Sequence, residues 1–296
     1  MKLVKYNFCD FEEYLKEKEF ASSSELKTFF SCPASLKYEV KASHDMYIGT
    51  AFELLVAKKI LGLKEFDEKF YITDLETKPT NAIEVIEKKN AQEHIKTLKN
   101  GKPSSSSAFY LELEREDYRY PLTKSQHSQL ESMFESISQA SFKGVKFEEL
   151  YKKADRELAV FWEDGEGRKK KARLDFVLEL DGVVYPFDLK TTSKPLKNFS
   201  YTCADFGYWI QAVHYQEGLM ALCKDKKVMP MTFLAVSKKQ PFECQFWKFE
   251  EDESYEEMVE AYQVLVDRFF SEEREEQSPF NKNDGIINIP KRMLFN

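Results

Sequence analysis

Two aspartates and one lysine lie close together in a part of the chain where strands are expected. The dipeptide Asp181–Gly182 joins two segments that are expected to be strands, 170–180 and 183–190, a pattern that predicts a β-hairpin. Asp188 and Lys190 are two residues apart on the second strand, so their side chains point to the same face. Asp175 lies on the first strand, where its side chain can converge with the other two across the hairpin.

This trio could bind a metal ion, because two carboxylates on an otherwise apolar strand face are costly to bury unless a cation pairs with them. Mg²⁺ takes one or two protein carboxylates together with water and phosphate oxygens, and Mn²⁺ accepts the same ligand types. Such a metal activates water and stabilises charge on a phosphate under attack. Lys190 would position or help to deprotonate the water, or contact the phosphate, with its pKa lowered near the metal. The competing interpretation is an ion pair on a solvated sheet edge, since D-x-K is a common tripeptide.

The segments around the hairpin predict an α/β fold with a central mixed sheet of four or five strands flanked by helices. Periodicity and turn residues predict strands over 157–163, 170–180, 183–190, 228–237 and 242–249, and helices over 202–223 and 250–270.

The first half is expected to be mainly helical. Helices are predicted over 11–20 (capped by Asp10), 50–63, 81–99 and 124–141, with a Ser-rich loop over 101–109. We expect a single domain over 1–296, made of a helical portion (1–150), a core (151–272) and a peripheral tail (273–296).

Charge and composition restrict the class of protein. The formal net charge is −7 and the pI is near 5.4, so contact with DNA would need local basic patches or metal ions rather than the overall field. No apolar run reaches the length of a membrane span, and the N-terminus lacks a secretory apolar region. Five widely spaced cysteines without a CxxC pair argue against structural zinc and favour reduced thiols. A cytoplasmic location, in a bacterial or phage-infected cell, is therefore expected.

The stretch K-A-R-L-D-F-V…D-L-K-T-T resembles the active-site hairpin of PD-(D/E)XK nucleases, especially their RecB-like and exonuclease VIII-like branch. The helix that follows carries Q-A-V-H-Y, similar to the Q-x-x-x-Y signature of that branch. Gln211 and Tyr215 are four residues apart and share one helix face. The resemblance implies a restriction-endonuclease-like core in which this face lies beside the metal site and holds DNA or orders the site.

Two upstream segments extend the resemblance. S-S-S-E-L-K-T-F-F-S-C-P is similar to the S-x-S-x-L…C-P stretch of the branch, and G-T-A-F-E to its G-T-A-x-H helix. Glu53 stands where that helix usually supplies a histidine, and its carboxylate can also bind Mg²⁺ or Mn²⁺. Glu157 matches an acidic position at the start of the first strand and is a further metal candidate. The scattered cysteines argue against the iron–sulfur cluster that some relatives carry.

Basic residues near the hairpin are candidates for contact with phosphates: Lys171, Arg173, Lys194 and Lys197. For the basic turn that ends at Lys171, a solvated surface is an equally good interpretation. Phe199 or Trp209 could stack on an unpaired base, although core packing is the simpler role for Trp209. His214 is expected to be a core or surface residue and not a catalytic one.

The resemblance implies a Mg²⁺- or Mn²⁺-dependent DNA nuclease, with an exonuclease in recombination, replication or repair preferred. An endonuclease of a defence system and a non-catalytic DNA-binding module of the same fold are the alternatives. A single-strand annealing or recombination protein is the partner that the resemblance suggests, and an oligomer is compatible with the sequence.

Overall fold

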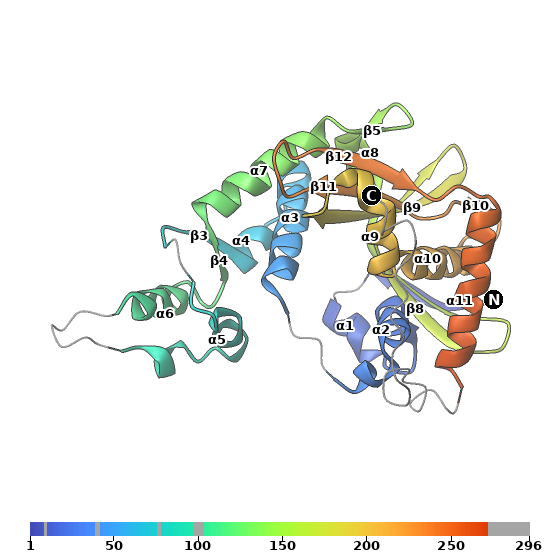
Figure 1. Ribbon diagram of the computed structural model, residues 1–296. Helices are drawn as coiled ribbons and strands as arrows, with labels where there is room; N and C mark the ends of the chain where they lie inside the picture. The colour runs from blue at the N-terminus through green and yellow to red at the C-terminus, as the bar shows by residue number, and fades with distance from the viewer. Residues whose placement is uncertain (9–10, 39–41, 76–77, 97–103, 272–296) are drawn as a thin grey trace, which may run out of the picture.

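A computed structural model describes residues 1–8, 11–38, 42–75, 78–96 and 104–271. Within these residues a mixed eight-stranded sheet forms the centre of the molecule (Figure 1). Its main path runs β1–β7–β8–β9–β11–β12, while β2 pairs with β8 and β10 with β9. The strands are β1 (Lys2–Phe8), β2 (Ala21–Ser22), β7 (Asp155–Glu163), β8 (Lys169–Leu180), β9 (Val183–Thr192), β10 (Lys227–Val228), β11 (Thr232–Ser237) and β12 (Cys244–Lys248).

The predicted three-stranded meander is present as β7, β8 and β9. These strands pair antiparallel, and Asp181 and Gly182 make the β8–β9 turn with φ of 51° and 76°. Two consecutive residues with positive φ are what a tight hairpin turn requires. β11 then joins β9 in parallel, which needs a crossover connection.

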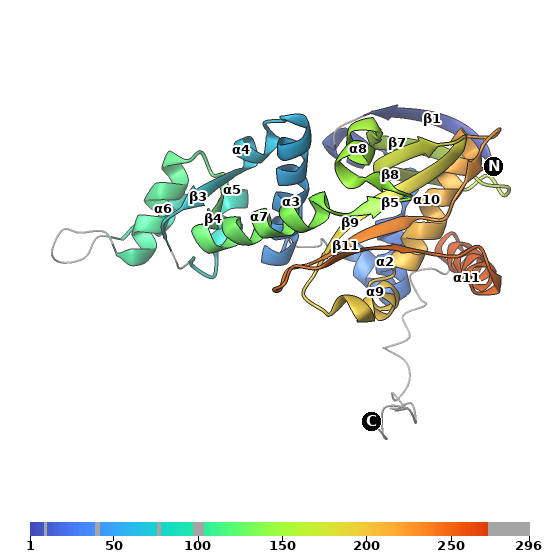
Figure 2. The same cartoon turned by 90° about the horizontal axis from the view of Figure 1, so that it is seen from above.

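Helices cover both faces of the sheet (Figures 1 and 2). On one face, α10 packs against β7 and β8 and is itself covered by α11 and α2. On the other face, α3, α7 and α8 contact β8, β9 and β11. The helices of the body are α1 (Phe11–Lys16), α2 (Ser23–Ser31), η1 (Pro33–Lys37), α3 (His44–Leu61), α7 (Lys124–Ser138), α8 (Phe147–Lys153), η3 (Leu196–Asn198), α9 (Phe199–Asp205), α10 (Tyr208–Leu222) and α11 (Glu253–Phe269).

An arm of short helices and strands extends away from the sheet beyond α3 and α7 (Figures 1 and 2). It contains the parallel pair of β3 and β4 with short helices around it. Its elements are α4 (Glu65–Lys69), β3 (Phe70–Thr73), α5 (Ala82–Lys88), η2 (Ala91–His94), α6 (Ser105–Arg115) and β4 (Tyr120–Thr123). A small hairpin of β5 (Ser141–Phe142) and β6 (Val145–Lys146) lies between α7 and α8.

The fold class is confirmed, and several local predictions need correction. The sheet is larger than four or five strands, since β1 and β2 of the supposedly helical first portion add to it. The predicted helix 202–223 is divided into α9 and α10 at Gly207, which has a φ of 62°. The serines of the predicted loop begin α6, with the Ser104 side chain accepting from the Ser107 amide. The proposed cap Asp10 and the tail 273–296 lie outside the described residues. No helix in the described part is long and apolar enough to cross a membrane.

Candidate active site

The ladder between β8 and β9 ends where the predicted carboxylates lie. Its last pair is Phe176 opposite Phe187, and the same register sets Asp175 beside Asp188. Beyond this point β8 pairs with β2, and β9 continues beside β11. The two strands therefore separate at the aspartates, which leaves space for side chains between them.

Asp175 also lies where β8 changes the sheet face to which its apolar side chains point. Leu174 belongs to the core beside α10, whereas Phe176 belongs to the core beside α3. On the neighbouring strand, the register places Glu157 opposite Asp175. Glu157 has a φ of 57°, in the left-handed region that residues with a side chain rarely adopt. The Asp175 carboxyl can consequently meet groups from both faces.

Asp188 is held by the two residues predicted to act with it. It is 1% exposed. Gln211 on α10 donates from Nε2 to Asp188 Oδ1 at 3.0 Å, and Lys190 Nζ lies 2.5 Å from Asp188 Oδ2. The structure thus brings Asp188, Lys190 and Gln211 together.

The two aspartates affect each other's charge. Burial raises the pKa of Asp175 well above its ordinary value, and the nearby Asp188 and Glu53 carboxyls raise it further. For Lys190, burial would lower the pKa, but Asp188 and Asp175 outweigh burial and the net shift is upward. In the metal-free protein Lys190 is therefore a firmly charged ammonium, unlike the depressed pKa expected beside a metal.

A small cavity of about 70 Å³ joins the other two predicted ligands to Asp175. Glu53, on α3, and Glu157 line it together with Asp175. Glu53 is exposed at the mouth of the cavity, but desolvation of its carboxyl by the surrounding protein raises its pKa to about 7, with Lys190 acting in the opposite direction. The Glu157 carboxylate is ion-paired with Arg173, so it is less available as a ligand than Glu53.

The donor set suits a hard divalent cation. Among the described residues no group of three or more Asp, Glu, His or Cys side chains is already gathered around one point. Asp175 and Asp188, however, are neighbours where the two strands separate, and the charge of Asp188 raises the pKa of Asp175, so a cation between them would favour the ionised form of both. The buried Oε1 of Gln211 also has no hydrogen-bond partner within the described part. Asp175 and Asp188 would hold Mg²⁺ or Mn²⁺, with Glu53 nearest to complete the set.

The predicted DNA contacts have different surroundings. Lys171 is 4% exposed, and its ammonium donates to the carbonyls of Tyr14 at 3.1 Å and Glu17 at 2.8 Å. Lys171 therefore supports the fold and is not available to phosphate, contrary to the prediction. Arg173 is paired with Glu157 at the edge of the cavity. Lys194 and Lys197 are exposed, with Lys194 2.7 Å from Asp205.

The remaining candidates lie inside the protein. Tyr215 is buried on the same face of α10 as Gln211, and its phenol feels the charge of the nearby Asp175. His214 is fully buried against Tyr262 and the Lys171 carbonyl, as expected of a core residue. Phe199 is 1% exposed, which excludes the stacking role considered for it.

Sequence reasoning did not identify Lys27. Its side chain rises from α2 toward the site, and its pKa is lowered to about 8 by burial and by the charge of Lys190, while Asp188 and Asp175 act in the opposite direction. The segment was recognised only as part of an S-x-S-x-L…C-P resemblance. Nothing local in the sequence indicates that α2 places this lysine beside β9.

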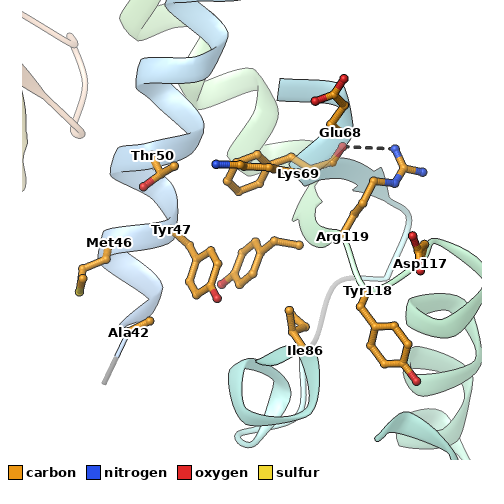
Figure 3. Close-up of a pocket in the computed structure, with 12 residues that line it drawn as sticks. Ala42, Met46, Tyr47, Thr50, Glu68, Lys69, Ile86, Asp117, Tyr118 and Arg119 are labelled. Carbon is orange, nitrogen blue, oxygen red and sulfur yellow. Dashed lines mark hydrogen bonds between the residues drawn. The ribbon is translucent and has the colours of Figure 1, made fainter. Parts of the chain in front are cut away.

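A separate cavity of about 390 Å³ lies between α3 and the arm (Figure 3). Tyr47 and Thr50 from α3 line it, opposite Tyr118 and Arg119 of the arm. The Arg119 guanidinium is already engaged with carbonyls of the arm and with Glu116. None of the predicted metal ligands lines this cavity, so the candidate site is the smaller one.

The comparison with protein families agrees with the fold. A family model described as a PDDEXK-like domain of unknown function (DUF3799) matches residues 22–283. Among solved structures, the crystal structure titled "Putative exonuclease" from Eubacterium rectale is similar over 95% of each chain, with 14% sequence identity and a TM-score of 0.48. That similarity is too low to carry an argument about activity. No curated protein matches the sequence.

Proposed function

Because the chain belongs to the family of PDDEXK-like domains of unknown function, we propose that it is a metal-dependent nuclease that hydrolyses phosphodiester bonds of DNA. The register that sets Asp175 beside Asp188, next to the Lys190 ammonium at the point where β8 and β9 separate, carries the proposal. Two carboxylates and one ammonium are what a phosphodiesterase site needs for a metal and a phosphate.

Mg²⁺ or Mn²⁺ bound there would supply an activated water and charge stabilisation at the phosphate. The protein's own part is to orient and to hold charge. Gln211 fixes one Asp188 oxygen, so the other oxygen and Asp175 face the separation between the strands. Lys190, at the end of the same strand face, holds the attacking water or a phosphate oxygen once its ion pair with Asp188 loosens.

We favour attack on DNA ends, with an endonuclease as the alternative. Both use the same chemistry, so the distinction lies in the substrate that enters. Linear duplex DNA and covalently closed circular DNA of the same sequence separate the two, since an enzyme that needs an end leaves the circle intact.

The test is digestion of end-labelled linear DNA with Mg²⁺, with Mn²⁺ and with chelator, for the wild type, Asp188→Ala and Lys190→Ala. Asp225→Ala, an exposed aspartate in a turn, is the control. We expect metal-dependent digestion that the control retains and both site variants lose by on the order of 10³-fold. DNA binding without digestion under any metal would favour the non-catalytic module instead.

A further inference from the structure

Lys27 of α2 lies beside the candidate site because Gly207, which faces it between α9 and α10, has no side chain. A Cβ built on Gly207 would lie 3.1 Å from Lys27 Cγ and 3.5 Å from Lys27 Cδ, so the stem of Lys27 passes directly over this glycine. Its ammonium then lies 5.9 Å from the centre of the Tyr208 ring. The Lys190 ammonium lies 5.0 Å from the centre of the same ring.

The Lys27 ammonium has no partner of its own. Within the described residues it makes no hydrogen bond and no ion pair, although the side chain is partly buried. Other buried lysines are satisfied: Lys170 lies 2.9 Å from Glu217 and 3.0 Å from Asp164, and Lys171 donates to two carbonyls. A partly desolvated ammonium without an acceptor is costly, so its place in the fold calls for an anion from outside.

We propose that Lys27 is a phosphate-binding residue of the active site, which contacts the DNA backbone at the strand held by Asp175, Asp188 and Lys190. The proposal rests on the proposed nuclease function. Both ammoniums lie within 6 Å of the centre of the Tyr208 ring, and the positive charge of Lys190 acts on Lys27. The contacts with Tyr208 offset this repulsion only in part, because cation–π contacts are weak. A backbone phosphate near the two ammoniums would supply a negative charge that attracts both, and Lys27 and Lys190 would then approach the strand from α2 and from β9.

The test is the affinity for a short DNA duplex in Ca²⁺ without turnover, measured for the wild type, Lys27→Ala and Lys27→Arg as salt is raised. Lys248→Ala is the matched control, since it removes one exposed lysine from edge strand β12. We expect Lys27→Ala to weaken binding by about ten- to a hundredfold and to reduce the slope of log K against log[salt] by about 0.7–0.9. Lys27→Arg should keep most of the affinity, and Lys248→Ala all of it.

Three results would overturn the proposal: an unchanged affinity and salt slope in Lys27→Ala, an equal loss in Lys27→Arg, or a shifted pH optimum without any change in affinity. The last would mean that Lys27 only tunes the charge of Lys190. These results are distinct from failure of the nuclease function, in which the wild type itself neither binds nor digests DNA. Thermal unfolding of each variant identifies any loss that is due to misfolding.

Discussion

The carboxyl groups around the strand separation differ in how readily each can serve a metal. Asp188 is fixed by Gln211 and Lys190, and the strand register places Asp175 beside it. Glu53 reaches the group from α3, with its pKa raised to about 7 by desolvation. Near neutral pH the Glu53 carboxyl is thus part protonated, and a cation that binds it must displace a proton.

We predict that Glu53→Gln weakens the apparent affinity for Mg²⁺ by on the order of 10–100-fold. In the wild type the affinity should rise as the pH increases through about 7, because Glu53 is raised to about that value and then loses its proton. This rise should be shallower in Glu53→Gln. Metal titrations of digestion at several pH values measure both effects.

Glu65→Gln is the control, because Glu65 is an exposed glutamate on α4. Equal Mg²⁺ dependence of Glu53→Gln and the wild type would remove Glu53 from the ligand set and leave two aspartates as the protein ligands.

At the scale of elements, the sequence predicts those parts of the fold that depend on local signals and not those that depend on long-range packing. The meander of β7, β8 and β9 depends on local information, namely alternation and an Asp-Gly turn, and it brings Asp175, Asp188 and Lys190 to one place. β1 was missed because it is an edge strand with little periodicity, and its pairing with β7 is a long-range choice. Lys27 was missed for the same reason, since the packing of α2 against α10 decides where its side chain points.

Gly207 has two roles: it ends α9 before α10 begins, and it leaves room for the Lys27 side chain. The variant Gly207→Ala tests both. Gly207 has a φ of 62°, which costs a residue with a Cβ about 1–2 kcal/mol. The added Cβ would also crowd Lys27 and Ile210. We predict a larger loss of unfolding free energy than this backbone cost, together with weaker DNA binding.

Gly62→Ala is a matched control, because Gly62 has a φ of 72° and nothing within 4 Å of its added Cβ. It should lose the backbone cost alone and keep DNA binding. If chemical denaturation gave the same loss for both variants and neither changed DNA binding, Gly207 would not position Lys27.

His214 makes the stability of the packing between α10 and β8 depend on pH, because it is buried between them. Burial lowers the pKa of His214 to about 3, so between about pH 6.5 and 3 the unfolded chain binds a proton that the folded chain does not. Stability therefore falls as the pH falls through this window, by about 2 kcal/mol at pH 5 relative to pH 8. We predict that His214→Gln reduces this pH dependence of the unfolding free energy, as measured by urea denaturation.

The comparison concerns the slope with pH and not the absolute stability, which any substitution in this core lowers. His127→Gln, on the partly exposed side of α7, should keep the wild-type slope. A wild-type slope in His214→Gln would assign the acid sensitivity to other groups.

At the scale of the whole molecule, the net charge of −7 gives divalent cations two ways to stabilise the fold: weak screening over the surface, and binding at the candidate site. Only the second depends on Asp188. A metal that binds the folded state alone adds about 2.7 kcal/mol when its concentration is a hundredfold above Kd. For a chain of 296 residues that corresponds to a rise in Tm of about 4 °C.

We predict this rise for the wild type in Mg²⁺ or Mn²⁺ relative to chelator, in the absence of DNA. Asp188→Asn should lose most of it. Without metal, the same variant loses the repulsion between Asp188 and Asp175 but also the ion pair between Asp188 and Lys190, so the comparison concerns the metal-induced rise in Tm and not the Tm of the metal-free proteins. Thermal unfolding of both proteins with and without metal measures these effects independently of catalysis. If metal raised the Tm of the wild type and of Asp188→Asn equally, the cation would be bound to the acidic surface and not at Asp188. A metal used in the reaction would then have to bind together with the DNA.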